Sequence, residues 1–370
     1  MQKAVIVLPT YNEARNIEKV IHGIFDQQPH VPNWELSVLV VDSDSPDRTG
    51  DIVTTLAQKS YSRLYLLKSK KEGLGKAYLR GFADAIDMHH ADVVFEMDSD
   101  FSHDPAEIPR YLREIDRGAD MVVGTRYSKG GSIPANWGLD RKIYSLGANM
   151  VIRLGFMRLK NTEWTNGYRA ITSKLAQQIM PVMGSYTGYV FQVAFLDKAI
   201  LAGAKIVEIP IQFADRVHGE SKINAKQYAF QTFAYVFNNS SFIKYLIVGV
   251  TGAIVDIGGM RFLWKVIGLD VLLANRISME LAVITNFLLN NFWAFSHKRV
   301  RGGVPAYLKS FFQFNLIAMG SFIIQEGCIR LGISLFGVEH ATWYKICTIA
   351  FVIIPYSYIL YNKVIWKKQA

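Results

Sequence analysis

Cysteine is nearly absent from this sequence. The 370 residues contain two, Cys328 and Cys347, and both lie in apolar stretches. Their placement argues against a disulfide framework, and the paired spacing of a cysteine-based metal site is absent. The apolar run in the N-terminal stretch MQKAVIVLP is too short for a signal peptide. We therefore expect the N-terminal part of the chain to stay in a reducing cytoplasm.

Acidic residues are scarce in the last third of the chain. Residues 242–370 contain 5 Asp and Glu against 13 Lys and Arg, a net charge of +8, whereas residues 1–241 contain 26 against 28, a net charge of +2. A nucleic-acid-binding protein usually carries its positive charge on a polar face or tail. Here the excess coincides with the most apolar region, as in membrane segments with basic cytoplasmic flanks. The sequence predicts a lipid bilayer, and no nucleic acid, as a partner.

Long apolar runs are confined to the same region. Four segments each have about the ~20 residues needed to cross hydrocarbon. The loop HKRVRGG after the second segment and the terminal KKQA are basic, while the connections 265–271 and 332–342 are nearly uncharged. The positive-inside rule then places residues 1–241, the central loop and the C-terminus in the cytoplasm, which predicts a multi-pass protein of the cell membrane. The predicted spans are 242–264, 272–292, 308–329 and 343–361.

Several charged residues fall within or at the ends of these spans. Intramembrane charges indicate function by default, but ion pairs that only hold the helices together explain them equally well. Glu326 and Arg330, four residues apart, are expected to form a local pair. The other charged residues concerned are Asp256, Arg261, Arg276 and Glu280.

Strand and helix patterns alternate over residues 1–125. Short apolar runs predict buried strands, and the segments between them place apolar residues at helical spacing. This alternation predicts a mostly parallel sheet with helices on both faces. Ser45, followed by Pro46, is expected to cap one of the helices. The predicted strands are 3–9, 36–41, 63–67, 92–97 and 120–124.

Polar clusters follow three of these strands, at 10–13 (TYNE), 42–44 (DSD) and 98–100 (DSD). In open α/β sheets ligands bind outside the carboxyl ends of the strands. Because the carboxyl ends of parallel strands meet at one edge, the clusters are expected to converge there. The convergence predicts a ligand site.

Asp98 and Asp100 are two residues apart and follow the predicted strand that contains the apolar run 93–95. Carboxylates this close repel each other where the dielectric constant is low, and a bound cation removes that repulsion. Mg²⁺ and Mn²⁺ prefer oxygen ligands and keep substrate phosphates as further ligands. Solvated turns also contain the D-x-D pattern, but the two neighbouring strand-end clusters favour a metal site that binds a diphosphate.

Two segments have the pattern of helices that lie at a membrane surface. Residues 135–157 combine apolar and aromatic side chains at helical spacing with Arg141, Lys142 and Arg153. An ordinary amphipathic helix packed on the sheet fits this window equally well. The second such segment is 224–242.

The motifs VLPTYNE, VVDSDSPDRT, EGLGKAYLRGFADA, MDSDFSHDP, GTRY, DRKIYSLGAN and ADRVHGESK occur in this order. Together they resemble the polyprenol-phosphate (dolichol-phosphate) mannose synthases, which are family-2 glycosyltransferases of the GT-A fold. KYLIVGVTGAIVD and NFLLNNFWAF resemble a GtrA-like four-helix membrane module. The implied fold is an α/β GT-A (Rossmann-like) catalytic domain over 1–222, an amphipathic interfacial linker over 223–241 and an all-α four-helix transmembrane domain over 242–370.

The resemblance implies a nucleotide-sugar site at the strand-end clusters. Asp98 and Asp100 would hold the metal together with Ser102, which stands where some relatives have Gln. The base-contacting pair, usually Asp-Asp, is Asp42-Ser43 here, which leaves purine or pyrimidine open. The implied nucleotide-sugar residues are Pro9, Tyr11, Glu13, Val41, Asp42, Ser43, Asp98, Ser99, Asp100, Arg126, Arg216 and Lys222.

The resemblance also implies a site for a lipid phosphate, formed by Arg126, Arg141 and Ser145, with Asp100 and Arg126 as catalytic residues. His218 replaces a basic residue of some relatives. The segment TNGYRA takes the acceptor-loop position, with Asn166 where many relatives have Ser.

The implied activity is inverting, metal-dependent transfer of mannose from GDP-mannose to a polyprenyl or dolichyl monophosphate, with Mn²⁺ or Mg²⁺, at the cytoplasmic membrane face. GYVFQ at 188–192 and ADRVHGESK look more like the mannosyl than the glucosyl branch. A UDP-glucose-dependent glucosyltransferase is the alternative. The membrane module could also act as a flippase for the glycolipid. A processive polysaccharide synthase is disfavoured because no Q-x-x-R-W motif is present.

Overall fold

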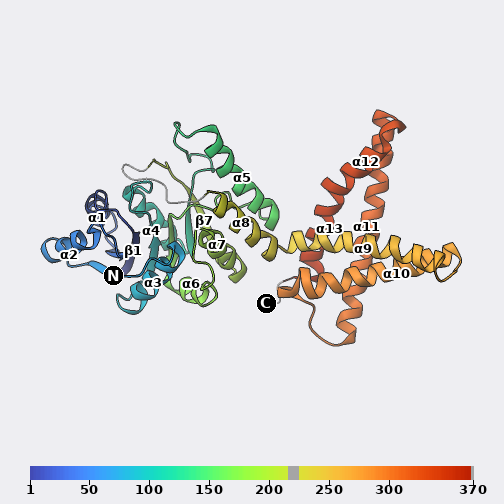
Figure 1. Ribbon diagram of the computed structural model, residues 1–370, viewed down its shortest axis with the longest axis horizontal. Helices are drawn as coiled ribbons and strands as arrows, with labels where there is room; N and C mark the ends of the chain where they lie inside the picture. Colours follow the sequence, from blue (N-terminus) through green and yellow to red (C-terminus); the bar gives the residue numbers. More distant parts are fainter. Residues whose placement is uncertain (216–224, 368–370) are drawn as a thin grey trace. The chain divides into compact units, whose positions relative to one another are not determined.

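A computed structural model describes residues 1–215 and 225–367. The chain divides into two compact units, Met1–Val236 and Phe237–Ala370. Figure 1 shows that the first unit contains a β-sheet with helices around it, whereas the second unit consists of helices. The predicted combination of an α/β domain and a helical domain is therefore confirmed.

The first unit is built on a seven-stranded sheet of order β3-β2-β1-β4-β6-β5-β7. All neighbouring pairs are parallel except those of β6, which runs antiparallel to β4 and β5. Each of the five predicted strands overlaps one of β1 to β5, while β6 and β7 come from a region for which we predicted no strands. The strands are β1 (Gln2–Thr10), β2 (Trp34–Asp42), β3 (Leu64–Lys68), β4 (Val93–Glu96), β5 (Met121–Thr125), β6 (Arg169–Thr172) and β7 (Ile206–Pro210).

Helices cover both faces of the sheet because the central strands are apolar on both sides. On β1, Ile6 and Leu8 belong to a buried cluster with Ile21 of α1 and Leu112 of α4. Val7 points to the other face, where it meets Gly81 of α3 at a distance that leaves no room for a Cβ atom. The helices are α1 (Ile17–Phe25), α2 (Thr49–Lys59), α3 (Leu74–Asp87), α4 (Ile108–Asp116), α5 (Leu139–Phe156), α6 (Ser173–Ile179), α7 (Val190–Ala202) and α8 (Ala225–Asn239), with 3-10 turns η1 (Gln28–His30), η2 (Pro105–Glu107) and η3 (Met180–Val182).

The second unit contains four helical stretches long and apolar enough to cross a membrane: Ser241–Lys265, Val271–Ala294, Val304–Phe336 and Val338–Ile365. Each predicted span lies within one of them. Short π-helical segments interrupt the second and fourth stretches. The elements are α9 (Ser241–Lys265), α10 (Val271–Leu289), η4 (Asn290–Ala294), η5 (Ser296–Lys298), α11 (Val304–Phe336), η6 (Val338–His340), α12 (Ala341–Thr348), η7 (Ile349–Ile353), α13 (Ile354–Leu360) and η8 (Tyr361–Ile365).

Three of the charged residues in these helices form polar contacts that the structure describes. Arg330 Nε lies 2.9 Å from Glu326 Oε1, so the predicted pair forms. Asp256 of α9 accepts a hydrogen bond from Ser278 of α10 (3.0 Å). The contact joins the two helices by a hydroxyl-carboxylate hydrogen bond rather than by the expected ion pair.

Candidate active site

The ends of β1 and β2 are held together by Asp42. The two strands are in register, with Thr10 opposite Asp42, and Thr10 Oγ1 donates to Asp42 Oδ1 (2.9 Å). Ser45 donates its amide to Oδ2 (3.1 Å) and its hydroxyl to Oδ1 (2.5 Å), and its Oγ accepts from the Asn12 amide (3.0 Å). Asp42 therefore fastens the first two polar clusters to each other.

The prediction that Ser45 caps a helix is wrong. Helix α2 begins at Thr49, after Arg48 in a left-handed conformation (φ 67°). The Ser45 hydroxyl donates to the Asp42 carboxylate, and a hydrogen bond to an ionised acceptor is stronger than one between neutral groups. Asp47 accepts from the amide and the hydroxyl of Thr49 (3.1 and 2.5 Å). A capping oxygen has to accept from an amide of the helix, and Ser45 Oγ accepts instead from the Asn12 amide, which follows β1 and is distant in sequence.

The other predicted nucleotide-binding residues of β1 and β2 lie at the same edge. The Lys71 ammonium is 3.5 Å from the centre of the Tyr11 ring, which is a cation–π contact just after the carboxyl end of β1. Glu13 Oε2 accepts from the Asn16 amide side chain (2.9 Å). Their contact with a nucleotide stays a prediction. The residues are Pro9, Tyr11, Glu13, Val41 and Ser43.

Residues 98–102, here called the acidic loop, follow β4. Asp100 is buried, and its Oδ1 accepts from the amide (3.0 Å) and hydroxyl (2.6 Å) of Ser102. The Asp98 side chain is 42% exposed. Phe101 has φ 66°, a backbone conformation that costs an aromatic residue energy and that clusters at functional sites. Ser99 Oγ lies 3.5 Å from Pro9 O, so the loop reaches the end of β1.

The donor atoms of the acidic loop fit a hard divalent cation. Asp98 and Asp100 supply carboxylate oxygens, one exposed and one held in a fixed orientation by Ser102. The described residues contain no group of three or more His, Cys, Asp or Glu side chains that could hold a metal. An ion bound here would thus take only part of its ligands from the protein, as Mg²⁺ does when substrate phosphates and water complete its shell. The proposed ligation by Ser102 itself stays a prediction.

His103 connects the acidic loop to β5. Its Nδ1 accepts from the Asp98 amide (3.0 Å), which leaves the proton on Nε2, and Nε2 faces Asn166 Oδ1 at 2.9 Å. Asn166 Nδ2 in turn donates to Gly124 O at the end of β5 (2.8 Å). The bonding pattern assigns a neutral imidazole, 1% exposed and stacked on Tyr168. The acceptor-loop residue Asn166 thus joins β5 and the acidic loop.

A buried acid lies beneath the acidic loop. Glu96 is the last residue of β4 and is 0% exposed, and its Oε2 is 4.0 Å from Arg169 Nη1. Burial raises the pKa of Glu96 to about 7, although the Arg169 guanidinium opposes the shift. Arg169 donates to the backbone oxygens of Gln192 (2.8 Å) and Trp164 (3.1 Å). The pair anchors β4 to β6 just before the chain turns into the acidic loop.

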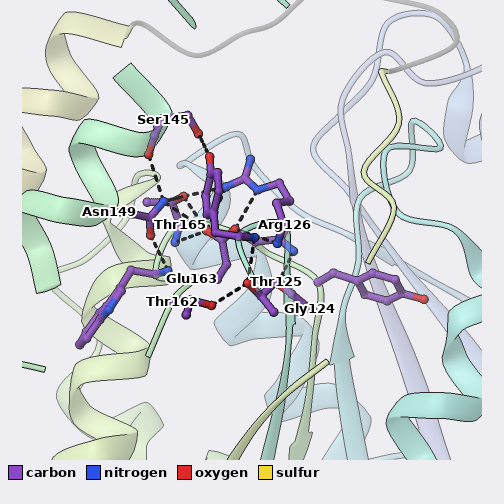
Figure 2. Close-up of polar contacts among 12 residues, drawn as sticks. Gly124, Thr125, Arg126, Ser145, Asn149, Thr162, Glu163 and Thr165 are labelled. Carbon is purple, nitrogen blue, oxygen red and sulfur yellow. Dashed lines mark hydrogen bonds and ion pairs between the residues drawn. The ribbon is translucent and has the colours of Figure 1, made fainter. Parts of the chain in front are cut away.

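Arg126 follows β5 and belongs to a group we call the arginine cluster, which Figure 2 shows and whose other members are Asn149, Glu163 and Thr165. Its Nε is 2.8 Å from Glu163 Oε2, and its Nη2 is 2.9 Å from both Glu163 Oε1 and Thr165 Oγ1. Burial alone would raise the pKa of Glu163, but the Arg126 charge and the hydrogen bonds outweigh it and lower that pKa. The ion pair also raises the pKa of Arg126 against the effect of burial. Both groups are therefore charged at neutral pH.

Helix α5 brings Ser145 to the arginine cluster. The Tyr127 hydroxyl and Ser145 Oγ are 2.5 Å apart. Arg141, one turn earlier, pairs with Asp215 (3.3 Å) and stacks on the Trp137 ring (3.9 Å). The structure thus joins two of the predicted phosphate-binding residues, Arg126 and Ser145, through Tyr127, and places Arg141 on the same helix as Ser145.

Residues 5–194 match the family model described as Glycosyl transferase family 2, and residues 244–366 match that described as GtrA/DPMS, transmembrane domain. The chain belongs to glycosyl transferase family 2. The predicted resemblance is therefore confirmed, and the protein is a glycosyltransferase with a GtrA-type membrane domain.

Three relatives are 32–37% identical to this chain over the residues that match. A dolichol-phosphate mannosyltransferase from Pyrococcus furiosus is 32% identical over 343 residues, which cover 90% of this chain and 92% of the relative. A polyprenol monophosphomannose synthase from Mycolicibacterium smegmatis is 35% identical, with 60% of this chain and 82% of the relative covered. An undecaprenyl-phosphate mannosyltransferase from Micrococcus luteus is 37% identical, with 60% and 88% covered.

Among solved structures, the chain matches glucosyl-3-phosphoglycerate synthase from Mycobacterium tuberculosis in complex with Mn²⁺ and UDP-glucose. The TM-score is 0.46 at 20% identity, with 64% of this chain and 78% of that chain covered.

Sequence reasoning missed part of this glycosyltransferase site. Glu163 and Asn149 stand in segments that the family motifs include or adjoin, but neither has a local pattern that marks it as a partner of Arg126. The sequence around Glu96 has only the pattern of a strand that ends, and nothing in it predicts a buried acid. The predicted residues Arg216, His218 and Lys222 lie outside the described residues.

Proposed function

We propose that this family-2 glycosyltransferase transfers mannose from GDP-mannose to a polyprenyl monophosphate, with inversion at the anomeric carbon and a divalent cation held by Asp98 and Asp100. The carrying observation is the match to a dolichol-phosphate mannosyltransferase that spans both units, 92% of that relative. The acidic loop and the arginine cluster supply the two kinds of charge that such a transfer needs.

The acidic loop would bind the donor. A cation bound there neutralises negative charge on the diphosphate that leaves. Ser102 holds the Asp100 carboxylate in one orientation, so that it is preorganised before the donor arrives. The ammonium of Lys71 beside Tyr11 adds positive charge at the same edge. Asp42, the first residue of the predicted base-contacting pair, is held in place at this edge by hydrogen bonds from Thr10 and Ser45.

The arginine cluster would bind the acceptor. A phosphate monoester carries about −1.5 to −2 charges at pH 7, so its oxygen is already a nucleophile and needs no strong general base. Arg126, together with Ser145 and Arg141, would offset the repulsion between this anion and the donor diphosphate, and would orient the attacking oxygen.

Helix α5 exposes apolar side chains that suit a lipid acceptor. Tyr144 is 69% exposed and Ile143 is 59% exposed, next to Ser145 in the sequence. A helix with such a face lies in the membrane interface and buries these side chains among lipid chains. The other large apolar side chains exposed on α5 are Leu139, Leu146, Met150, Val151 and Leu154. With the positive-inside pattern, this face supports catalysis at the cytoplasmic surface.

Transfer assays test the proposal. The purified full-length protein is incubated with a polyprenyl phosphate, Mn²⁺ or Mg²⁺, and a panel of labelled nucleotide sugars. We expect labelled lipid product from GDP-mannose, and loss of that product with a chelator. Product from UDP-glucose alone would assign the protein to the glucosyl alternative, and transfer that is indifferent to chelators would refute the metal site.

A further inference from the structure

The Arg126 guanidinium is held on two of its three nitrogens. Nε and Nη2 meet the two carboxylate oxygens of Glu163 as a fork, at 2.8 and 2.9 Å, and Nη2 also meets Thr165. Fork-to-fork pairing fixes the plane and rotation of the guanidinium, which a single contact does not. The described residues give Nη1 no hydrogen-bond acceptor.

The pair is almost fully removed from solvent. The Glu163 side chain is 0% exposed and that of Arg126 is 9% exposed. Removing two charges from water is unfavourable, and apolar side chains of similar volume would often stabilise the fold as well or better. Stability therefore does not explain why this buried ion pair is present. The small part of Arg126 that stays accessible to solvent indicates that the pair orients Arg126 toward a ligand.

Glu163 is itself immobilised. Its Oε1 accepts from the Thr165 amide (3.1 Å), the Thr165 hydroxyl (3.0 Å) and the Asn166 amide (3.2 Å), and its own amide donates to Glu208 Oε1 (3.2 Å). The carboxylate thus cannot rotate without losing several hydrogen bonds. It transmits the position of the 162–166 loop to Arg126.

The same loop is joined to α5 by Asn149. Its Oδ1 accepts from the Trp164 amide (2.8 Å), and its Nδ2 approaches Thr165 Oγ1 (3.3 Å) and Glu163 Oε1 (3.5 Å). Figure 2 shows Asn149 between Ser145 and this loop. Because Ser145 is on the same helix, one turn earlier, the network sets the spacing between Ser145 and Arg126.

We propose that Glu163 is a positioning residue for the acceptor: it fixes Arg126 so that Nη1 meets an oxygen of a phosphate monoester, in register with Ser145. This inference rests on the proposed function. It assigns no contact between Glu163 and the substrate, because Glu163 acts through the guanidinium alone.

The test measures kcat and KM for each substrate with Glu163→Gln and Glu163→Asp in the full-length protein. Gln keeps the volume but loses the charge and one half of the fork; Asp keeps the buried charge, and so the fold, but withdraws the carboxylate by one methylene. We expect kcat/KM for a polyprenyl phosphate to fall about 10- to 100-fold, since small displacements of an orienting group have effects of this size. The donor KM and the unfolding temperature of the Asp variant should stay close to those of the wild type. The control is Glu114→Gln, which removes an exposed ion pair between Glu114 of α4 and Arg117 (2.5 Å). It should change neither the kinetic constants nor the unfolding temperature.

A double-mutant cycle isolates the route through Arg126. Lys cannot form the fork, so we expect Arg126→Lys with Glu163→Gln to lose no more than Arg126→Lys alone, within twofold. Three results would each overturn the inference. They are additive losses of kcat/KM in the double variant, a lower acceptor KM in Glu163→Gln, and a donor KM that changes as much as the acceptor KM. Failure of the proposed function differs from all of these, because the wild type itself would then make no mannosyl lipid.

Discussion

The acidic loop places its two acids two residues apart, whereas the arginine cluster joins Arg126 to a glutamate 37 residues away on another segment. In the loop, one carboxylate is exposed and the other is oriented by a neighbour in sequence. In the cluster, both charges are almost fully buried and are oriented by residues from α5 and the 162–166 loop. A bound cation can draw two nearby carboxylates into one arrangement. A guanidinium that binds an anion has to be oriented by other protein groups.

The largest effect should come from the acidic loop. Asp100→Ala removes an oriented carboxylate, and we expect transfer to fall by about 10²- to 10³-fold or more. Labelled-product formation and thermal unfolding are measured on the same preparation. The exposed Asp51→Ala on α2 serves as the control and should leave both unchanged. An Asp100→Ala protein that is folded and fully active would refute the role of the loop.

The next effect concerns His103, which links the two parts. Asn at this position keeps an acceptor near Nδ1 for the Asp98 amide, and Gln keeps a polar atom near Nε2 for Asn166. We expect both variants to lose about 10-fold in activity through misplacement of the groups they no longer hold. His103→Asn should raise the acceptor KM more, and His103→Gln should raise the donor KM more. Equal changes in both constants for both variants would contradict a division of the site into two parts.

A smaller effect is expected from the apolar face of α5. Ile143→Glu or Tyr144→Glu places a charge where lipid chains are expected. Either variant should raise the KM for a long-chain polyprenyl phosphate by up to about 10-fold, because a side chain that is only partly buried by lipid contributes less than the about 1.5–3 kcal/mol of complete burial. A short, water-soluble prenyl phosphate should show less than a twofold change. Met88→Glu, an exposed apolar residue outside α5, is the control. The same change for long and short acceptors would show that the face does not meet lipid.

The smallest effect is on stability, at a buried acid outside both parts of the site. Burial raises the pKa of Asp197 above its ordinary value of 3.8, although Arg158, Lys198 and a hydrogen bond from Tyr235 (2.8 Å) oppose the shift. Its protonated form is therefore favoured by folding, and the protein loses stability as pH rises from 3.8 through the raised pKa. Asp197→Asn lacks this loss but still accepts from Tyr235. The unfolding temperatures of this variant and of the wild type are measured between pH 4 and 8. The difference in favour of the variant should grow by a few degrees as pH rises, at about 2–4 °C for each kcal/mol of unfolding free energy. A constant difference would contradict the shift.

Much of the fold could be predicted because its determinants are local. The apolar runs of β1 to β5 and the helical spacing between them are visible in the sequence, and so are the four apolar segments. Strands β6 and β7 were not predicted. β6 has four residues and follows a loop, so its strand character depends on pairing with β4 and β5 rather than on its own pattern.

The site divides in the same way. Asp98 and Asp100 could be predicted because their spacing and their place after a strand are typical of a metal site that binds a diphosphate. Arg126 and Ser145 came from resemblance to a family, and nothing in the sequence shows that Glu163 and Asn149 would hold them. Ser45 shows the limit of a local rule, since its hydroxyl oxygen accepts from the amide of Asn12, 33 residues earlier, and not from an amide of α2.

Helix α11 has 33 residues, more than the other three apolar stretches. At about 1.5 Å per residue it is roughly 50 Å long, about 20 Å more than a typical hydrocarbon layer. Such hydrophobic mismatch is relieved by tilting the helix, by thickening the bilayer around it, or by leaving its last turns among the headgroups. The protein should therefore respond to bilayer thickness, with its activity in vesicles of short-chain and long-chain lipids differing even when the acceptor is the same.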